Sequence, residues 1–290
     1  MAVTNEAANA LPDLMSEDTV RAALLEDLGR AGDITTMALI DAEARMTAEI
    51  VARKPGVVAG TQCARQAFTL LDASVRYTQM IGDGEPVAAG DAIACVEGSA
   101  RSILSSERVA LNFLGRLSRI ATATATLREA CEPHAVHITC TRKTTPGLRF
   151  LEKAAIRAGG GRNHRFGLDD AVLIKDNHIE AVGSVTKAVE RARRACGHLV
   201  MVEVEVDTLA QLRDAIAAGP DAVLLDNMSV EDLKRAVEMV DGHLITEASG
   251  GITLETIGDI AKTGVDVISV GWLTHSVTNL DIGLDVVGSG

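Results

Sequence analysis

Polar and charged residues close six short apolar segments in the second half of the chain. In chain order, the closing residues are Arg142 and Lys143, Lys175, Glu205, Asp226, Glu247 with Ser249, and Ser269. In parallel α/β sheets and barrels, the chemistry lies at the carboxyl ends of the strands, where the following loops converge. Burying an unpartnered charge is costly, so polar groups at all six positions favour a shared binding site over six separate rim residues.

The charges near these segments are unevenly distributed along the chain. Eight basic and three acidic residues lie between positions 142 and 175, so this segment carries +5 within a chain of net charge −12. The acidic total argues against a general nucleic-acid or anionic-membrane binder, whereas a focused cationic pocket suits a small polyanion. Lys153 and Arg157 are four residues apart on a predicted helix, and we expect both to be solvated.

Two carboxylates and two glycine turns extend this chemistry. Glu205 and Asp226 could form a general acid/base pair or a Mg²⁺ site, and the neighbouring anion pocket favours Mg²⁺. An ion pair between Glu205 and Lys175 is compatible with either role. The turns SGGI (249–252) and SVGW (269–272) offer backbone N–H groups to a phosphate, and they contain Ser249, Gly250, Gly251, Ser269, Val270 and Gly271. GGGRNHR (159–165) matches neither nucleotide-binding glycine fingerprint, which disfavours P-loop ATP chemistry.

The elements that must position these residues follow from the periodicity of apolar residues. Near-continuous Val/Ile/Leu runs alternate with helical patterns, which predicts a buried parallel sheet that is closed or nearly closed as a barrel; the runs are 135–141, 171–176, 199–207, 222–227, 243–248 and 265–271. Asp207, Ser229 and Thr253 are predicted N-caps of the intervening helices. The first half instead predicts a helix at 17–29, β-rich segments at 47–60 and 74–99, and a long joining helix at 107–130.

Cysteine usage and the N-terminus predict a cytoplasmic protein. The five cysteines are odd in number and show neither a C-x-x-C pair nor zinc-ligand spacing. The first residues lack a basic stretch followed by an apolar one, and no segment has enough consecutive apolar residues to span a membrane. We therefore expect free thiols and no processing.

Six collinear motifs carry a family resemblance that runs from about residue 17 to 285. They are ERVALNFLGRLS (107–118), TRKTTPGLR (141–149), AGGGRNHRFGLDDAVLIKDNHI (158–179), VEVEVDTLAQL (202–212), LLDN (224–227) and EASGGI (247–252). Together they resemble quinolinate phosphoribosyltransferase, the nicotinate-nucleotide pyrophosphorylase (carboxylating) family. The resemblance implies an α/β fold with an N-terminal α/β sandwich (1–117, with an interface helix), an incomplete parallel α/β barrel (118–272), and a C-terminal segment (273–290) that packs back on the N-terminal domain.

The resemblance also implies a reaction and residue roles. Quinolinate and phosphoribosyl pyrophosphate would give nicotinate mononucleotide, pyrophosphate and CO₂ with Mg²⁺, in de novo NAD biosynthesis. Carried over by motif, the quinolinate pocket would contain Thr141, Arg142, His164, Arg165 and Lys175. Lys143 would reach toward the reacting centre or the phosphates, Glu205 and Asp226 toward the metal and ribose, and the two glycine turns toward phosphate. Lys143, Glu205 and Asp226 are the expected catalytic residues. Arg108 would enter from the neighbouring subunit, which makes a homodimer obligatory and leaves a hexamer of dimers open.

Three alternatives and one departure accompany this interpretation. Lys175 at a strand end could be a Schiff-base lysine of an aldolase, and a molybdenum-transport protein shares the fold, although TTPGLR fits the quinolinate enzymes better. The segment 83–98 resembles the hairpin of a biotinyl or lipoyl carrier, but residues 74–99 lack the lysine that attachment requires. Cys140 stands where the family has an acidic residue, which puts the orientation of Arg142 by that acid in doubt.

Overall fold

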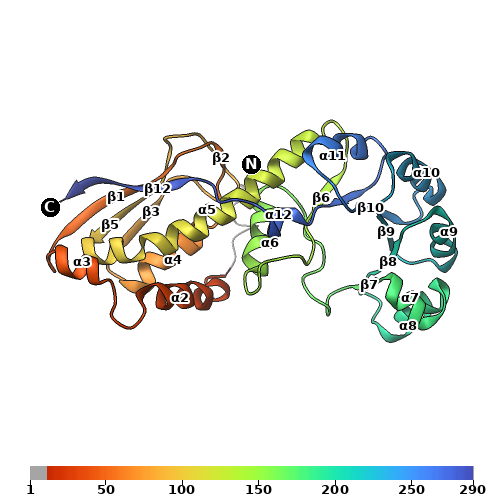
Figure 1. The fold of residues 1–290 in the computed structure, drawn as a ribbon, viewed down its shortest axis with the longest axis horizontal. Helices are drawn as coiled ribbons and strands as arrows, with labels where there is room; N and C mark the ends of the chain where they lie inside the picture. Colours follow the sequence, from red (N-terminus) through yellow and green to blue (C-terminus); the bar gives the residue numbers. More distant parts are fainter. Residues whose placement is uncertain (1–11, 290) are drawn as a thin grey trace, which may run out of the picture. The chain divides into compact units, whose positions relative to one another are not determined.

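The computed structural model describes residues 12–289, which form two compact units (Figure 1). The first contains the chain up to Ala125, Thr144–Gly160 and the chain from Thr274; the second contains Thr126–Lys143 and Gly161–Leu273. This division differs from the expected boundary after residue 117, because Thr144–Gly160 clusters with the N-terminal elements. The fold class is confirmed as α/β with a parallel barrel-like sheet.

The first unit is built on an antiparallel sheet in the order β12-β1-β5-β3, with a separate β2-β4 pair. Its elements are α2 (Leu14–Leu28), α3 (Ile34–Leu39), β1 (Arg45–Ala52), β2 (Gly56–Val57), α4 (Thr61–Leu71), β3 (Arg76–Gln79), β4 (Pro86–Val87), β5 (Ala92–Ser99), α5 (Ala100–Ala130), α6 (Arg149–Ala158) and β12 (Ile282–Ser289). β12 pairs with β1 from Met46 to Ala52, so the end of the chain lies alongside its first strand (Figure 1).

The second unit contains six strands that are all parallel, in the order β6-β11-β10-β9-β8-β7. Its elements are β6 (His137–Thr139), β7 (Val172–Ile174), α7 (Asp176–Val182), α8 (Val185–Ala195), β8 (Val202–Val206), α9 (Leu209–Ala218), β9 (Ala222–Asp226), α10 (Val230–Val240), β10 (Ile245–Ser249), α11 (Leu254–Ala261) and β11 (Val267–Ser269), and α12 (Trp272–His275) follows. All six predicted apolar runs form strands of this sheet. Helices α8 to α11 flank its outer face (Figure 1).

The segment that follows α6 continues the barrel beyond β6. Arg162 N–H donates to the Ile138 carbonyl at 2.8 Å, and Thr139 Oγ1 donates to the Arg162 carbonyl at 3.0 Å. Arg162 thus forms an isolated parallel bridge with Thr139, an edge residue of the sheet. This pairing brings the next two residues, Asn163 and His164, to the interior of the barrel.

Two local expectations are wrong. Thr208 caps α9 in place of Asp207, because its side chain accepts the Gln211 N–H while Gln211 reaches back to the Thr208 backbone; Ser229 and Thr253 are N-caps as predicted. Lys153 is fully buried and Arg157 is half-buried, so neither is solvated. The reason is that α6 packs into the first unit, where its neighbouring Glu152 is also fully buried.

Among residues 12–289, none of the helices combines the length and apolar character needed to cross a bilayer. The core of both units is aliphatic, with Ile, Leu, Val and Ala as its main buried residues. An amphipathic helix needs only one apolar face, and these helices bury that face against their own unit's sheet or a neighbouring helix.

Candidate active site

Strand register places several of the predicted polar residues on one face of the barrel sheet. Parallel pairing aligns Glu205 with Leu224 and Leu224 with Glu247, and two residues further along it aligns Asp226 with Ser249. Because side chains alternate between faces along a strand, Glu203 and Glu205 point the same way from β8. The carboxylates therefore project from the same side as the residues at the carboxyl ends of β9 and β10.

Lys175 and Glu205 form the predicted ion pair at the carboxyl ends of β7 and β8. Lys175 Nζ lies 2.6 Å from Glu205 Oε2, and the lysine side chain is 46% exposed against 16% for the glutamate. An ammonium group held at a strand end by a half-buried carboxylate remains available to an anionic ligand. Lys175 is also the N-cap residue of α7, and His178 Nδ1 of that helix accepts the Lys175 N–H at 3.0 Å.

Arg142 and Arg165 form the cationic part of the site. Partial burial lowers the pKa of the Arg165 guanidinium, and the positive charge of Arg142 lowers it further. Arg165 Nη1 donates to the Ala171 carbonyl at 3.0 Å, which fixes the direction of the side chain. Thr141 Oγ1 accepts the Lys143 N–H at 3.0 Å and so closes the turn that carries Arg142 and Lys143.

The turn after β10 is locked against the end of β9. Asn227 N–H donates to the Ser249 carbonyl at 2.9 Å, and Asn227 Nδ2 donates to Asp226 Oδ2 at 2.7 Å. Gly250 has φ +95°, and a Cβ there would lie 2.2 Å from Asn227 Oδ1, so only glycine fits. Gly251 is also left-handed, with φ +60°.

At the end of β11, Ser269 is buried and the backbone is again tied to β6. Val270 N–H donates to the Thr139 carbonyl at 2.9 Å, and Gly271 leads into α12. Cys140 is fully buried, and its Sγ donates to Asn163 Oδ1 at 3.5 Å, which ties β6 to the inward segment that carries His164.

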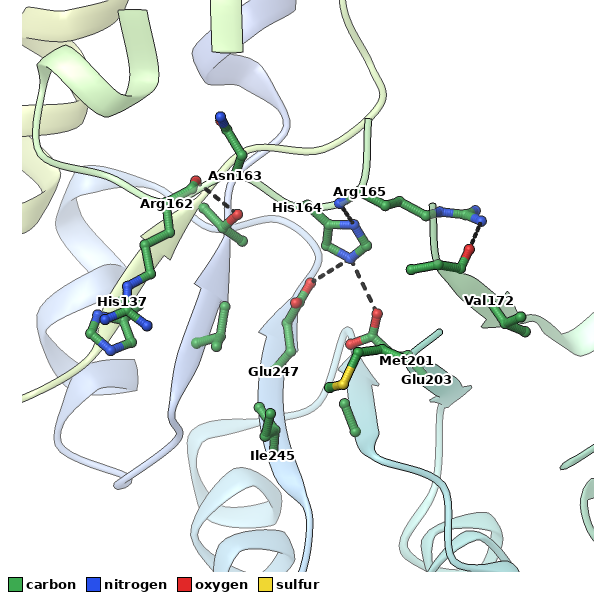
Figure 2. Close-up of a pocket in the computed structure, with 14 residues that line it drawn as sticks. His137, Arg162, Asn163, His164, Arg165, Val172, Met201, Glu203, Ile245 and Glu247 are labelled. Atoms are coloured by element: carbon green, nitrogen blue, oxygen red, sulfur yellow. Dashed lines mark hydrogen bonds and ion pairs between the residues drawn. The ribbon is translucent and has the colours of Figure 1, made fainter. Parts of the chain in front are cut away.

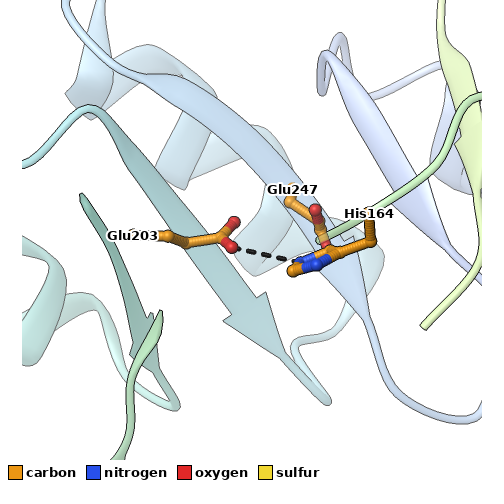
Figure 3. Close-up of side chains that lie close together, drawn as sticks. All are labelled: His164, Glu203 and Glu247. Carbon is orange, nitrogen blue, oxygen red and sulfur yellow. Dashed lines mark ion pairs between the residues drawn. The ribbon is translucent and has the colours of Figure 1, made fainter. Parts of the chain in front are cut away.

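His164 lies between two glutamates inside the barrel (Figures 2 and 3). Its Nε2 is 3.2 Å from Glu203 Oε2 and 3.7 Å from Glu247 Oε1, while its Nδ1 accepts the Arg165 N–H at 2.8 Å. Burial, and secondarily the charge of Glu203, raise the pKa of Glu247 to about 7. Sequence reasoning missed Glu203 and treated Glu247 only as a strand end; the signal was the Glu-Val-Glu alternation of β8.

A cavity of about 260 Å³ adjoins this cluster. Its lining includes the first residues of β6, β7, β9, β10 and β11: His137, Val172, Ala222, Ile245 and Val267. Of the predicted site residues, His164 and Arg165 line it (Figure 2), whereas Lys175, Glu205, Asp226 and the glycine turns do not. The cavity thus extends toward the amino ends of the strands, away from the predicted chemistry. Arg108 lies exposed on α5 in the first unit.

Comparisons with known proteins match one enzyme family over nearly the whole chain. Residues 33–118 match the quinolinate phosphoribosyl transferase N-terminal domain model, and residues 120–285 match the C-terminal domain model. The probable nicotinate-nucleotide pyrophosphorylase [carboxylating] of Bacillus subtilis is 48% identical, covering 90% of each chain. The Mycobacterium leprae enzyme is 44% identical, over 93% of this chain and 97% of its own. The solved structure of the Francisella tularensis nicotinate-nucleotide pyrophosphorylase superposes with a TM-score of 0.92 at 41% identity, covering 96% of this chain and 98% of its own.

Proposed function

The chain belongs to the quinolinate phosphoribosyltransferase family, and from this premise we propose how its own residues carry out the reaction. The enzyme transfers the phosphoribosyl group of phosphoribosyl pyrophosphate to quinolinate. With loss of CO₂, this gives nicotinate mononucleotide and pyrophosphate, a step of de novo NAD biosynthesis. It is a glycosyltransferase of the pentosyl class.

The observation that carries the residue assignment is the pair of guanidinium groups at Arg142 and Arg165. Their charges act on one another in a partly buried setting, where the pKa of Arg165 is lowered. Such a pair is stabilised by an anion, and the planar guanidinium fork matches a carboxylate. Quinolinate brings two carboxylates, which we assign to Arg142, Arg165 and Lys175, with Thr141 and His164 completing the pocket.

Ribosyl transfer is assigned to the carboxyl-end residues Lys143, Glu205 and Asp226. Departure of pyrophosphate leaves positive charge on the ribose, and a fixed carboxylate stabilises charge of that sign. Glu205 is held in place by Lys175 at 2.6 Å, and Asp226 by the Asn227 amide at 2.7 Å. Both carboxylates are thus oriented before substrate arrives. The Lys143 ammonium, on the turn closed by Thr141, is assigned to the pyrophosphate that leaves.

Decarboxylation then requires little from the protein. Once the ring nitrogen carries the ribose it is positively charged, and this charge stabilises the carbanion that remains when the adjacent carboxylate departs as CO₂. What remains for the protein is to exclude water from that centre.

Glu205 and Asp226 also have the donor chemistry expected for Mg²⁺. Both are half-buried carboxylates on adjacent strands, and Mg²⁺ is bound by one or two carboxylates together with substrate phosphates. When bound, the ion would neutralise negative charge on the pyrophosphate. The phosphate side is assigned to the backbone of Ser249, Gly250 and Gly251, and of Ser269, Val270 and Gly271, which needs no side-chain charge.

The active form is proposed to be a cytoplasmic homodimer, with a hexamer of dimers as a further assembly. Arg108 is exposed on α5, which suits a side chain donated to a neighbouring subunit. All five cysteines are free thiols, in keeping with a reducing compartment.

The activity is tested with quinolinate labelled at the carboxylate that is lost. Incubation with phosphoribosyl pyrophosphate and Mg²⁺ is expected to release labelled CO₂ and nicotinate mononucleotide in equal amounts. A folded protein that releases neither contradicts the proposal. Borohydride is expected to trap no carbonyl substrate, because Lys175 Nζ is engaged by Glu205 at 2.6 Å.

A further inference from the structure

Glu247 is a buried acid that the reaction above does not use. Its side chain is 6% exposed, and within the described part of the chain its Oε1 receives no hydrogen bond. A buried carboxylate oxygen without a hydrogen-bond donor is costly, so the retention of Glu247 in the barrel interior calls for an explanation. The groups that face it are Glu203 from β8, His164 from the inward segment and the Ser269 hydroxyl from β11, while the aligned residue on β9 is the apolar Leu224.

The hydrogen bonds of His164 determine where its proton lies. Nδ1 accepts the backbone N–H of Arg165 at 2.8 Å, so Nδ1 carries no proton. The imidazole is then neutral, with its hydrogen on Nε2, which points at Glu203 Oε2 at 3.2 Å. Glu203, the nearer glutamate, accepts this hydrogen. Glu247 lies 3.7 Å from the same Nε2 and is a second acidic side chain beside this N–H group.

This arrangement argues against a metal at the cluster. His164, Glu203 and Glu247 offer ligand atoms within 4.8 Å of one another, which by donor type suits a divalent cation. A metal, however, binds the lone pair of an imidazole nitrogen, and here Nε2 bears hydrogen while Nδ1 is engaged by Arg165. Metal binding would break the bond to the Arg165 backbone.

We propose that Glu203 and Glu247 are positioning residues, which hold His164 as the neutral Nε2–H tautomer so that its Nδ1 anchors the backbone of Arg165. Arg165 is thereby held by two hydrogen bonds. Its backbone N–H donates to His164 Nδ1, and its guanidinium donates to the Ala171 carbonyl at 3.0 Å. The orientation of this arginine is thus set from the barrel interior. The inference rests on the proposed function where it takes Arg165 to bind quinolinate.

Glu247 has a second effect through its charge. Because its pKa is raised to about 7, Glu247 is largely protonated in mildly acidic solution. Ionisation of Glu247 adds a negative charge behind the pocket for a dianion. This added negative charge weakens quinolinate binding as the pH rises.

The tautomer is tested without reference to activity. Nitrogen-15 NMR of the full-length protein labelled at histidine, with His164 assigned by His164→Gln, is expected to show the neutral Nε2–H tautomer at pH 6.5. Glu203→Gln is expected to change these signals, and Glu238→Gln, an exposed residue of α10, to leave them unchanged. An Nδ1–H tautomer or an imidazolium at that pH overturns the proposal. So does one equivalent of Zn²⁺ bound by the wild type and not by Glu247→Gln.

The effect on substrate is tested by the KM for quinolinate between pH 6 and 8.5. The wild-type KM is expected to rise about tenfold more over this range than that of Glu247→Gln, which cannot ionise but keeps the shape of the acid. Glu247→Ala is expected to show a high KM at every pH, with kcat less affected, and Glu238→Gln to follow the wild type. A Glu247→Gln profile that matches the wild type overturns the proposal. Absence of any turnover with the expected NMR signals would instead count against the proposed function alone.

Discussion

Arg116 on α5 and Glu152 on α6 form a buried ion pair that also holds the loop following Lys143. Glu152 Oε1 accepts Arg116 Nε at 3.0 Å, and Oε2 accepts the Thr145 N–H at 3.0 Å. Arg116 Nη2 donates to Thr145 Oγ1 at 2.6 Å and to the Thr274 carbonyl at 2.9 Å. The pair therefore joins α5, α6, the 144–145 loop and the start of the C-terminal segment, within the first unit.

Removing the negative partner of this pair should destabilise the protein strongly. Glu152 is fully buried, and Glu152→Ala leaves a mostly buried Arg116 without its counter-charge. Loss of one partner of a buried pair costs roughly 3 to 5 kcal/mol, and urea unfolding monitored by circular dichroism measures it. The matched control is Glu97→Ala, whose 46%-exposed side chain lies 3.9 Å from Arg76 and should cost less than about 1 kcal/mol. Equal losses in the two variants would contradict this account.

The Lys175–Glu205 pair should separate substrate binding from the chemical step. Lys175→Ala removes a cation from the proposed quinolinate pocket, so the KM for quinolinate should rise and kcat/KM fall roughly 100-fold. Glu205→Gln keeps its size but loses the charge that stabilises the ribosyl cation, so kcat should fall most. Steady-state kinetics with each substrate varied in turn measures both. If the two variants show the same KM-to-kcat pattern, the division of roles is wrong.

The barrel and its rim were predictable because strand ends and apolar runs are local properties. The pairing of Lys175 with Glu205 follows from two adjacent strands closing with opposite charges. The His164 cluster was not predictable in this way. It depends on the Arg162–Thr139 bridge, which turns a loop into the barrel and brings His164 to Glu203, 39 positions later in the chain.

The burial of α6 shows a second limit of the sequence pattern. Lys153 and Arg157 have the spacing of a solvated helix face, yet Lys153 is fully buried because α6 joins the first unit. The side of α6 that faces inward becomes clear only from the hydrogen bond between Glu152 and Arg116, a residue of α5 that is distant in the sequence. Helical periodicity identifies a face, whereas tertiary packing decides what covers it.

A site shared between subunits should allow complementation. Arg108→Ala and Lys175→Ala are each expected to have very little activity at low quinolinate concentration, where the roughly 100-fold fall in kcat/KM expected for Lys175→Ala applies. If Arg108 enters from the neighbouring subunit, a mixed dimer has one site with both residues intact. Co-refolding equal amounts should then restore about a quarter of the wild-type activity, by random pairing of subunits. Activity no greater than that of the separate variants would argue against donation of Arg108 across the interface.

Removal of Mg²⁺ by a chelator should abolish activity without changing the stability of the fold. With EDTA in excess, turnover is expected to stop and to return with added Mg²⁺, while the unfolding midpoint stays unchanged because the protein's own residues orient Asp226. Asp226→Asn is expected to raise the Mg²⁺ concentration needed for half-maximal activity at least tenfold. Asn227→Ala is the companion variant: it keeps the carboxylate but removes its 2.7 Å hydrogen bond, and should have a smaller effect. Full activity in EDTA would refute the metal assignment.

Glu247 should make the folded protein less stable as the pH rises. Its pKa is about 7 when folded, against 4.5 for an ordinary glutamate, so the native state binds the extra proton between these values. The resulting stabilisation is complete below pH 4.5 and is lost as the pH rises through 7. Glu247→Gln cannot ionise, so relative to the wild type it should gain roughly 3 kcal/mol between pH 4.5 and 8. Urea unfolding of both proteins across this range measures the difference, with Glu238→Gln as the exposed control. A difference that is independent of pH would mean that Glu247 titrates in the fold as it does in water, and that burial and Glu203 together do not hold its proton.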